Sequence, residues 1–278
     1  MSEKVDYKGD EYVKFRPNYP KELYSIIYEF YEEKTNEYEK AIDIGTGTGQ
    51  VASELAQKFK QVYGVDRLPD MINHAIQKEN IQYSLSDAED LSRFEDHSMD
   101  LITVGTAFHW FNFDMFYKET KRVLKPNSGV LAIWTYFFSI IKDNEELNNI
   151  IKKKFIEPLL PYSDPKIHHA MTLYREIDFP FKEVDRYICP KSEDLLNQSK
   201  KVFNHSLLEK EMTLDQYASY LKTASGYVTY KKEHPEIDEE NDPVDSTINA
   251  IADHLGVTDK RSYVVHLQWP LVLVLCRD

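Results

Sequence analysis

The sequence predicts an α/β fold built on a doubly wound, mostly parallel sheet. In the first half of the chain, short apolar runs typical of buried strands alternate with segments of helical periodicity. Three of the nine glycines, Gly45, Gly47 and Gly49, directly follow the first of these runs, where a strand would turn into a helix. Of the 278 residues, 42% are hydrophobic, which is enough material for one large core.

The apolar runs of the first half predict strands over residues 40–45, 61–66, 81–85, 99–105 and 130–136. Apolar residues at intervals of three and four predict helices over residues 51–59, 69–76 and 113–124. Strands that alternate with helices pair in parallel through crossover connections, and the connecting helices cover both faces of the sheet.

The pattern changes after residue 136 and becomes mainly helical. Helical periodicity appears over 145–155 and 244–255. Thr213 and Gln216 have the spacing of a capping box at the start of another helix. Proline-rich stretches and an acidic loop over 233–243 separate these helices.

The chain is expected to end in one long strand over 263–275. Pro270 lies inside it, and since proline lacks an N–H, the strand needs a bulge or an edge position there. We therefore divide the chain into an α/β core with an N-terminal lid (1–136), a helical region that inserts into or caps the core (137–262), and a C-terminal strand that completes the sheet (263–278). Together these parts are expected to form a single structural domain.

Composition and charge disfavour several classes of protein. The 47 Asp and Glu residues outnumber the 34 Lys and Arg residues, and the net charge of −13 disfavours nucleic-acid and membrane partners. No apolar run approaches the roughly 20 residues of a membrane helix, and the N-terminus has no apolar signal segment. Two cysteines are too few for a disulfide framework or a metal cluster. We expect a cytoplasmic protein, monomeric or homodimeric, that uses no metal.

The glycine-rich stretch 41–50 (AIDIGTGTGQ) is the motif that carries chemistry. A phosphate-binding P-loop requires Gly-Lys followed by Ser or Thr, whereas Gly49 precedes Gln50 here. A dinucleotide fingerprint requires its third glycine at position 50, where this chain has glutamine. The remaining nucleotide-type ligand is S-adenosylmethionine, which carries no phosphate. It needs close approach of the backbone and carboxylates for its ammonium and hydroxyl groups.

Three aspartates mark the ends of three successive predicted strands at nearly equal intervals. Asp43 lies two residues before the first glycine, Asp66 ends the second strand, and Asp87 follows the third. Asp66 can accept both ribose hydroxyl protons, and Asp87 can meet an adenine amino group. Taken singly, each aspartate is equally explained as a helix cap or a solvated turn. The three together favour an S-adenosylmethionine site.

Together with these motifs, the first half of the sequence resembles the class I S-adenosylmethionine-dependent methyltransferases. The segments 12–20 (YVKFRPNYP) and 107–111 (AFHWF) are similar to elements of one group in particular, typified by the fungal trans-aconitate methyltransferases. The segment 123–134 (VLKPNSGVLAIW) is similar to the superfamily's turn into its fifth strand. The resemblance covers residues 12–136 well and is much weaker beyond residue 140.

The resemblance implies a Rossmann-like, seven-stranded, mostly parallel sheet with strand order 3-2-1-4-5-7-6 and an antiparallel strand 7. It also implies S-adenosyl-L-methionine as the cofactor. Asp43 and the glycine loop would lie beside its methionine part, Asp66 beside the ribose, and Asp87 with Ala88 beside the adenine. The remaining expected cofactor contacts are Tyr12, Arg16, Arg67 and Thr106.

The acceptor is expected to be a small molecule, preferably a trans-aconitate-like acid methylated on a carboxylate oxygen. A carboxylate is ionised at pH 7 and needs no general base, so catalysis reduces to positioning, desolvation and exclusion of water. Arg16 is the leading candidate for a clamp on the carboxylate. His109 is the candidate for orienting an acceptor oxygen or for acting as a base. The expected acceptor contacts are Tyr19, His109, Trp110 and Trp134.

Several of these residues also have a structural explanation. Arg16 is equally explained by a surface ion pair, and Tyr12 and Tyr19 by core packing instead of a lid over the cofactor. His109 is otherwise a cap of the helix that follows it, and Trp134 is otherwise only a packing residue.

Other functions stay open or are disfavoured. A methyltransferase for a neutral metabolite or a quinone-like precursor stays open, as does a non-catalytic S-adenosylmethionine-binding module. The glycine spacing disfavours a nicotinamide-dependent reductase. The acidic charge and the lack of a Lys/Arg stripe disfavour methylation of RNA.

Overall fold

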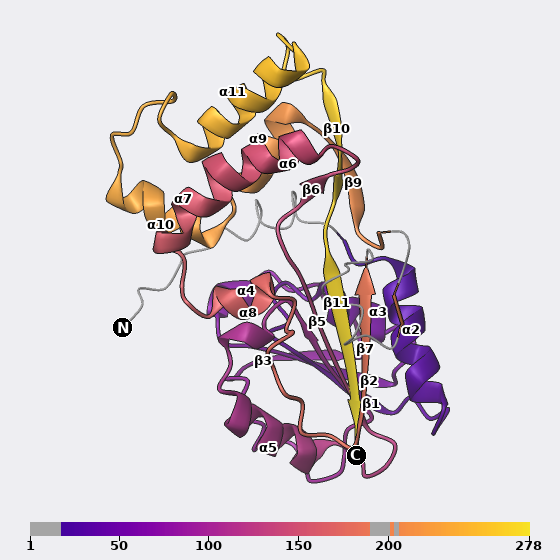
Figure 1. Cartoon of the computed structure of the whole chain (residues 1–278). Helices are drawn as coiled ribbons and strands as arrows, with labels where there is room; N and C mark the ends of the chain where they lie inside the picture. The colour runs from indigo at the N-terminus through magenta and orange to yellow at the C-terminus, as the bar shows by residue number, and fades with distance from the viewer. Residues whose placement is uncertain (1–17, 190–200, 203–205) are drawn as a thin grey trace. The chain divides into compact units, whose positions relative to one another are not determined.

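The computed structural model describes residues 18–189, 201–202 and 206–278, and the chain divides into two compact units (Figure 1). The described parts of Tyr19–Phe137, His168–Leu207 and Pro270–Asp278 form the sheet unit. The helical unit contains Phe138–Ile167 and Leu208–Trp269. Each unit has a sheet of its own.

The sheet of the sheet unit has the strand order β3-β2-β1-β4-β5-β11-β7-β8. Its strands are β1 (Lys40–Ile44), β2 (Gln61–Asp66), β3 (Ile81–Leu85), β4 (Leu101–Gly105), β5 (Val130–Tyr136), β7 (Glu183–Cys189), β8 (Lys201–Val202) and β11 (Leu271–Arg277). Strand β11 is antiparallel to its neighbours β5 and β7, whereas the other pairs are parallel. The predicted seven-stranded, mostly parallel sheet and its strand order are therefore confirmed, and the short strand β8 extends one edge.

Helices lie on both sides of this sheet, with α2 and α5 on opposite sides (Figure 1). The helices are α2 (Lys21–Glu32), α3 (Gln50–Leu55), α4 (Pro69–Asn73), the 3₁₀ turn η1 (Phe108–Trp110), α5 (Phe113–Val123) and α8 (Ile167–Met171). Helices α3 and α4 end earlier than predicted, and α2 was not predicted. The signal for α2 was nonetheless present, because its buried residues Leu23, Ile27 and Tyr31 recur at helical spacing.

The core of the sheet unit lies around the central strands. Every residue of β5 is buried, as expected for a central strand that is covered on both faces. Ile42, Ile102 and Leu131 from neighbouring strands belong to one apolar cluster with Phe116 of α5. This packing fixes the carboxyl ends of β1, β4 and β5 relative to one another.

The helical unit contains α6 (Glu145–Ile151), the π-helical turn η2 (Lys152–Ile156), α7 (Glu157–Leu159), the 3₁₀ turn η3 (Leu160–Tyr162), α9 (Leu214–Leu221), α10 (Ser225–Glu233), α11 (Pro243–Leu255) and a three-stranded sheet. The predicted capping box is present at α9. Thr213 Oγ1 accepts from the Gln216 N–H, and Gln216 Oε1 accepts from the Thr213 N–H. Among the described residues, no helix combines the length and the apolar character needed to cross a membrane.

The single closing strand predicted over 263–275 is wrong. The segment instead forms β10 (Val264–Gln268), in the helical unit, and β11, in the sheet unit. Pro270 lies between them, where no ladder hydrogen bond has to be donated, and its carbonyl accepts from the Phe137 N–H at 3.0 Å. Strand β10 pairs with β9 (Glu209–Thr213) and β6 (Ile140–Ile141), so only β11 completes the larger sheet.

Strand β7 is a second departure from the expected pattern. It lies within residues 137–262, which were expected to be helical, and pairs with β11 along its whole length. Strands β6 and β9 of the smaller sheet also come from this region. The region therefore contributes strands to both sheets in addition to its helices.

Candidate functional site

The strand order places the predicted site residues at one edge of the sheet. Strands β2 and β3 lie to one side of β1, and β4 and β5 lie to the other, so the direction of winding reverses between β1 and β4. Open α/β sheets bind ligands at this switch point, outside the carboxyl ends of the strands. Gly45 directly follows β1 and Thr106 directly follows β4, so both lie at this switch point.

The glycine loop after β1 has a backbone conformation that residues with side chains rarely adopt. Gly45, Gly47 and Gly49 all have positive φ angles, of 66°, 56° and 83°. A Cβ atom on Gly45 would lie 2.6 Å from Cβ of Ala107, so glycine permits the loop to approach the segment after β4. At Gly47, nothing lies within 4 Å of such an atom. The backbone at Gly47 is therefore open to close approach by a ligand.

Asp66 at the end of β2 holds the glycine loop in place. Its Oδ2 accepts from the Gly47 N–H at 2.9 Å, and its Oδ1 accepts from the Leu68 N–H at 2.9 Å. The side chain is partly exposed, so the same carboxylate also has surface available to a ligand. Arg67, the next residue, is exposed.

Asp43 is the most strongly perturbed carboxyl group of the site. It is only 1% exposed and accepts hydrogen bonds from Thr46 Oγ1 at 2.6 Å and Thr103 Oγ1 at 2.8 Å. Burial raises the pKa of Asp43 to about 7, against the opposing effect of the two hydroxyl donors, and the negative charge of Asp66 adds to the rise. A cation near Asp43 would lower this pKa and favour the charged carboxylate.

Thr103 was not predicted as a site residue. It lies directly opposite Asp43 in the parallel pairing of β1 with β4. The register between two strands that are 60 residues apart cannot be read from either strand alone. The only available signal was a hydroxyl group within an otherwise apolar run.

A second group of predicted residues lies at the ends of β4 and β5. Thr106 has a φ angle of 54°, which is unusual for a residue with a side chain, and its N–H donates to the Trp134 carbonyl at 2.9 Å. The hydroxyl groups of Thr106 and Tyr19 lie 3.4 Å apart. The rings of Tyr19 and Trp134 meet edge to face with their centroids 5.3 Å apart. Tyr19, Thr106 and Trp134 therefore form one cluster.

Trp134 is fully buried, but its indole N–H has no hydrogen-bond acceptor within the described part of the chain. The indole packs over Gly105, where a Cβ atom would lie 2.9 Å from a ring carbon. A buried donor without a partner costs about 1–3 kcal/mol, and the cost is removed when a ligand supplies an acceptor atom. Trp134 is therefore a packing residue, which is one of the two explanations given for it above, but its indole N–H is also an unsatisfied donor.

His109 and Trp110 lie in the turn η1 after β4. The turn is anchored by the fully buried ring of Phe108. His109 is 5% exposed, and its Nδ1 lies 3.3 Å from the hydroxyl group of Tyr174, another residue that was not predicted. The alternative that His109 caps the following helix is wrong, because Asn112 is the N-cap of α5 and accepts from the Met115 N–H.

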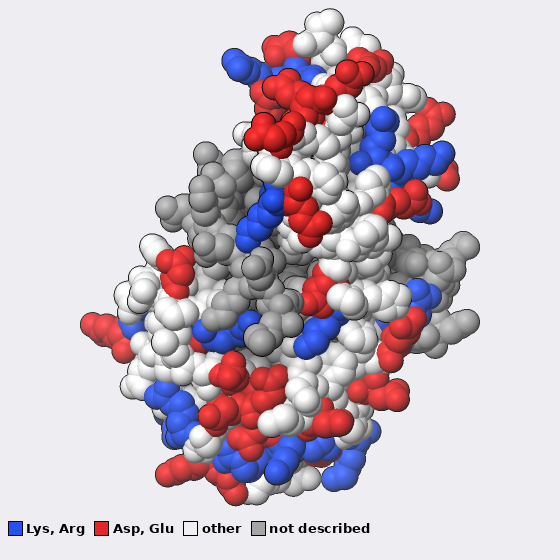
Figure 2. All heavy atoms as spheres, turned by 90° about the vertical axis from the view of Figure 1, so that its left-hand side faces the viewer, with Lys and Arg blue, Asp and Glu red and all other residues white. Residues whose placement is uncertain are grey.

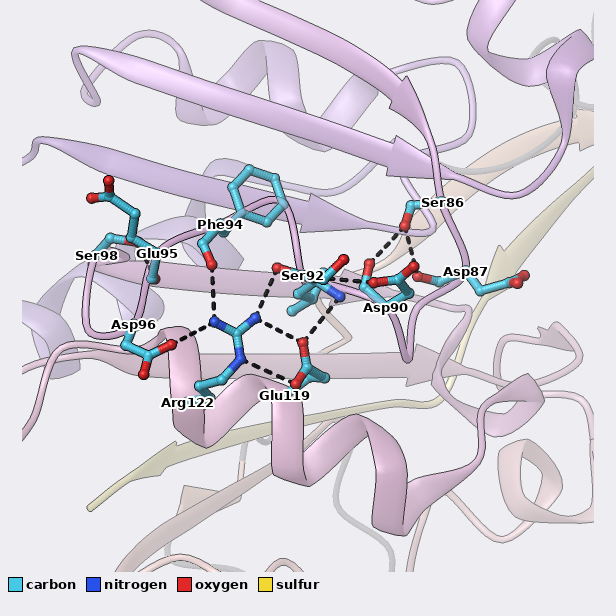
Figure 3. Close-up of polar contacts among 11 residues, drawn as sticks. Ser86, Asp87, Asp90, Ser92, Phe94, Glu95, Asp96, Ser98, Glu119 and Arg122 are labelled. Carbon is cyan, nitrogen blue, oxygen red and sulfur yellow. Dashed lines mark hydrogen bonds and ion pairs between the residues drawn. The ribbon is translucent and has the colours of Figure 1, made fainter.

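Asp87 and Ala88 follow β3. Asp87 is exposed, and its side chain points away from Arg122 of α5 (Figure 3). Its carbonyl accepts from the Asp90 N–H at 3.2 Å. Ala88 is 8% exposed and belongs to the core cluster. Tyr12 and Arg16 lie outside the described residues, so the structure gives no position for the predicted clamp.

Comparison with known proteins identifies the family. Residues 42–133 match a family described as a methyltransferase domain. A Dictyostelium discoideum protein named as a methyltransferase is 31% identical over 267 residues, which cover 96% of this chain and 91% of that protein. CRG1 of Saccharomyces cerevisiae, named as an S-adenosylmethionine-dependent methyltransferase, is 23% identical over 98% of this chain and 96% of its own length.

This chain belongs to the class I S-adenosylmethionine-dependent methyltransferases. A solved structure described as a type II methyltransferase from Anaeromyxobacter dehalogenans has the same fold as this methyltransferase. The alignment covers 95% of this chain and 98% of the solved structure, with a TM-score of 0.69 and 24% sequence identity.

The residues present in the methyltransferase fit its cofactor, S-adenosylmethionine. The cofactor is cationic at its sulfonium and amino groups, and the carboxyl group of Asp43 gains its charge when a cation is near. The open backbone at Gly47 admits a close ligand, and Asp66, bonded to that backbone, is suited to accept from ribose hydroxyls. All three residues are among those that the sequence motifs predict for the cofactor.

Proposed function

We propose that this methyltransferase transfers a methyl group to a carboxylate oxygen of a small-molecule acid of the trans-aconitate type. The resemblance of segments 12–20 and 107–111 to the trans-aconitate methyltransferase group supports this acceptor class. The observation that carries the proposal is the buried, unsatisfied N–H of Trp134, in a cluster with the hydroxyl groups of Tyr19 and Thr106. An indole N–H can only donate, so it suits an acceptor that presents oxygen atoms.

A carboxylate acceptor makes modest chemical demands on the protein. It is already ionised at pH 7, so no residue has to remove a proton from it. When bound, S-adenosylmethionine supplies a methyl group on a positively charged sulfur. We assign Trp134 to orient the acceptor oxygen, and His109 to position the acceptor from the neighbouring turn. Arg16 is proposed as the cationic clamp, because a guanidinium can hold a carboxylate with two hydrogen bonds.

The cofactor is proposed to be held by residues of the glycine loop and the strand ends. Asp43 faces the cationic methionine part, Asp66 accepts from the ribose hydroxyls, and Asp87 with Ala88 borders the adenine. Tyr12, Arg67 and Thr106 complete the proposed contacts. Because burial raises the pKa of Asp43 to about 7, the group is partly protonated at neutral pH, and a bound cation would favour release of that proton.

Acceptor choice is assigned to residues 137–262, since the methyltransferase domain family matches only residues 42–133. A small acceptor in place of a nucleic acid is supported by the net charge of −13. On the face drawn in Figure 2, basic side chains are interspersed with acidic ones. Cys189 and Cys276 are buried and form no disulfide within the described part of the chain, which is compatible with the proposed cytoplasmic location.

An acceptor panel tests the proposal. S-adenosylhomocysteine formation is measured with trans-aconitate and related di- and tricarboxylic acids, with their methyl esters, and with neutral quinols as the competing class. We expect turnover with free acids and none with the fully esterified forms. Turnover with quinols but not with acids would transfer the protein to the neutral-metabolite class. Tight binding of S-adenosylhomocysteine without turnover of any acceptor would favour a non-catalytic binding module.

Two variants connect the panel to the site. Trp134→Phe keeps an aromatic ring but removes the N–H, and we expect a raised acceptor KM with little change in the affinity for S-adenosylhomocysteine. Arg16→Ala is expected to damage acceptor use in the same way. If both variants leave the acceptor KM and turnover unaltered, these residues do not bind the acceptor.

A further inference from the structure

The segment 86–98, between β3 and β4, carries Asp87 and Ala88 but contains no helix or strand. It nevertheless enters the core, where Leu91 is fully buried and Phe94 is 6% exposed. Buried backbone carbonyls need hydrogen-bond donors, and a segment without regular structure has no ladder to supply them. Turns within the segment supply some of these donors, such as the Phe94 N–H to the Leu91 carbonyl at 2.9 Å, and the others have to come from elsewhere.

Arg122 of α5 supplies them (Figure 3). Its guanidinium donates to the carbonyls of Leu91 and Phe94, each at 2.9 Å, and to Asp96 Oδ1 at 2.7 Å. Arginine suits this position because its planar group carries five N–H donors in a fixed arrangement. A single side chain thus holds three separate points of the segment 86–98.

Glu119, one turn earlier on α5, completes the arrangement. Both of its carboxylate oxygens accept from Arg122, at 3.1 and 2.8 Å, and Oε2 also accepts from the Leu91 N–H at 3.2 Å. The hydrogen bond from Arg122 lowers the pKa of Glu119, so the pair stays charged at neutral pH. Glu119 therefore orients Arg122 and contacts the segment directly.

A third contact joins the start of the segment to the other end of α5. Glu89, beside Ala88, accepts from the N–H of Asn112 at 2.5 Å. Asn112 is the N-cap of α5 and follows the turn that contains His109 and Trp110. Helix α5 therefore holds the segment both next to Ala88 and further along, at Leu91, Phe94 and Asp96.

We propose that Arg122 and Glu119 are positioning residues for the cofactor, because they hold the segment that presents Asp87 and Ala88 to the adenine. This inference rests on the proposed assignment of Asp87 to the adenine amino group. Neither residue has to touch the cofactor. Loss of Arg122 would remove the side-chain donor to the carbonyls of Leu91 and Phe94 and the two hydrogen bonds that orient Glu119. The segment would then present Asp87 in many positions instead of one.

The test compares two ligands that differ at the 6-position of the base and, as a consequence, in whether N1 carries a hydrogen. Dissociation constants are measured by calorimetry for S-adenosylhomocysteine and for S-inosylhomocysteine, in which a carbonyl oxygen replaces that group. The wild-type protein should prefer the adenosyl ligand by about tenfold, which corresponds to one charge-assisted hydrogen bond of the weaker kind. Arg122→Met should bring the ratio of the two dissociation constants close to one, mainly by weakening the binding of S-adenosylhomocysteine.

Matched variants separate positioning from general destabilisation. Lys121→Met removes a neighbouring cation of α5 that pairs with Asp278, and it should keep the tenfold ratio. Arg122→Lys keeps the charge but not the forked geometry, and it should lose most of the ratio. If Arg122→Met does not fold, Arg122→Lys and Glu119→Gln are compared with Lys121→Met instead. Equal weakening of both ligands with an unchanged ratio would overturn the proposal.

Asp87→Ala distinguishes the two ways of failing. If Asp87→Ala abolishes the preference but Arg122→Met and Arg122→Lys keep it, the positioning role is overturned and the adenine assignment survives. If Asp87→Ala keeps the preference, the assignment is wrong and the positioning proposal falls with it. Support requires that Asp87→Ala and Arg122→Met each abolish the preference, and that combining them causes no further loss.

Discussion

The substitution Asp43→Asn should change how the stability of the ligand-free protein depends on pH. In the folded chain, burial raises the pKa of Asp43 from 3.8 to about 7. Between about pH 4 and pH 7, the folded state therefore keeps a proton that the unfolded state has lost. Stability contributed by this proton is fully present below pH 4 and is lost as the pH rises through 7.

The size of the effect follows from the pKa difference. A rise of the Asp43 pKa from 3.8 to about 7 corresponds to about 4 kcal/mol of unfolding free energy. The folded protein loses all of this stabilisation once the pH is well above the folded-state pKa. Asparagine cannot ionise, so the variant lacks this loss. The hydroxyl groups of Thr46 and Thr103 can rotate to donate to the amide oxygen or to accept from the amide nitrogen.

Urea unfolding of the ligand-free protein, followed from pH 4 to pH 8.5, measures the effect. Other groups titrate over this range, so the informative quantity is the difference in unfolding free energy between Asp43→Asn and the wild type. This difference should become more favourable to the variant by about 4 kcal/mol as the pH rises from 4 to 8. A difference that stays constant with pH would show that Asp43 titrates normally and refute the reasoning.

Thr103→Val provides an independent check on the cause. Thr103 Oγ1 donates to Asp43 Oδ1, and a donor to a carboxylate stabilises its charged form. Removal of this donor should raise the pKa of Asp43 further, so the loss of stability should extend to a higher pH than in the wild type. A loss that moves to lower pH would mean that the Thr103 hydroxyl does not stabilise the charged form of Asp43.

Three further predictions concern the site. Asp66→Ala should weaken S-adenosylhomocysteine binding by about 1–3 kcal/mol, the cost of a lost charge-assisted hydrogen bond; an unchanged calorimetric dissociation constant would contradict the ribose assignment. Gly45→Ala should destabilise the fold by about 1–3 kcal/mol in urea unfolding, since its Cβ would meet Ala107 at a positive φ; wild-type stability would show that the loop relaxes freely. Tyr174→Phe should lower kcat without changing cofactor affinity, because it removes the partner of His109 Nδ1; an unaltered kcat would mean that this contact does not position His109.

Much of the cofactor half of the fold could be predicted because its signals are local. Strands β2, β3 and β5 have the predicted bounds, and β1 and β4 differ from them by at most two residues. The glycine spacing also located the loop that contacts Asp66. A glycine needed for a positive φ and an aspartate at a strand end are both readable from a few neighbouring residues.

The failures involve residues that are distant in the chain. The apolar run 263–275 looks like one strand, and only its different partners, β9 and β6 for β10 and β5 and β7 for β11, divide it at Pro270. Strand β7 has seven residues but no regular alternation of buried and exposed positions, and it pairs with β11 along its whole length. Strand pairing is a tertiary interaction, so propensity alone could not identify these two cases.

The sequence by itself determined the order of strands and helices in the first half, the glycine loop and the three carboxylates at the strand ends, because each depends on backbone conformation within a few residues. Tertiary structure alone decided the chemistry of those groups. The raised pKa of Asp43 comes from its burial, partly offset by a hydroxyl group 60 residues away. The carbonyls of Leu91 and Phe94, in the segment after Asp87, accept from an arginine on α5. Burial and long-range hydrogen bonds depend on packing, and packing brings together residues that no local pattern connects.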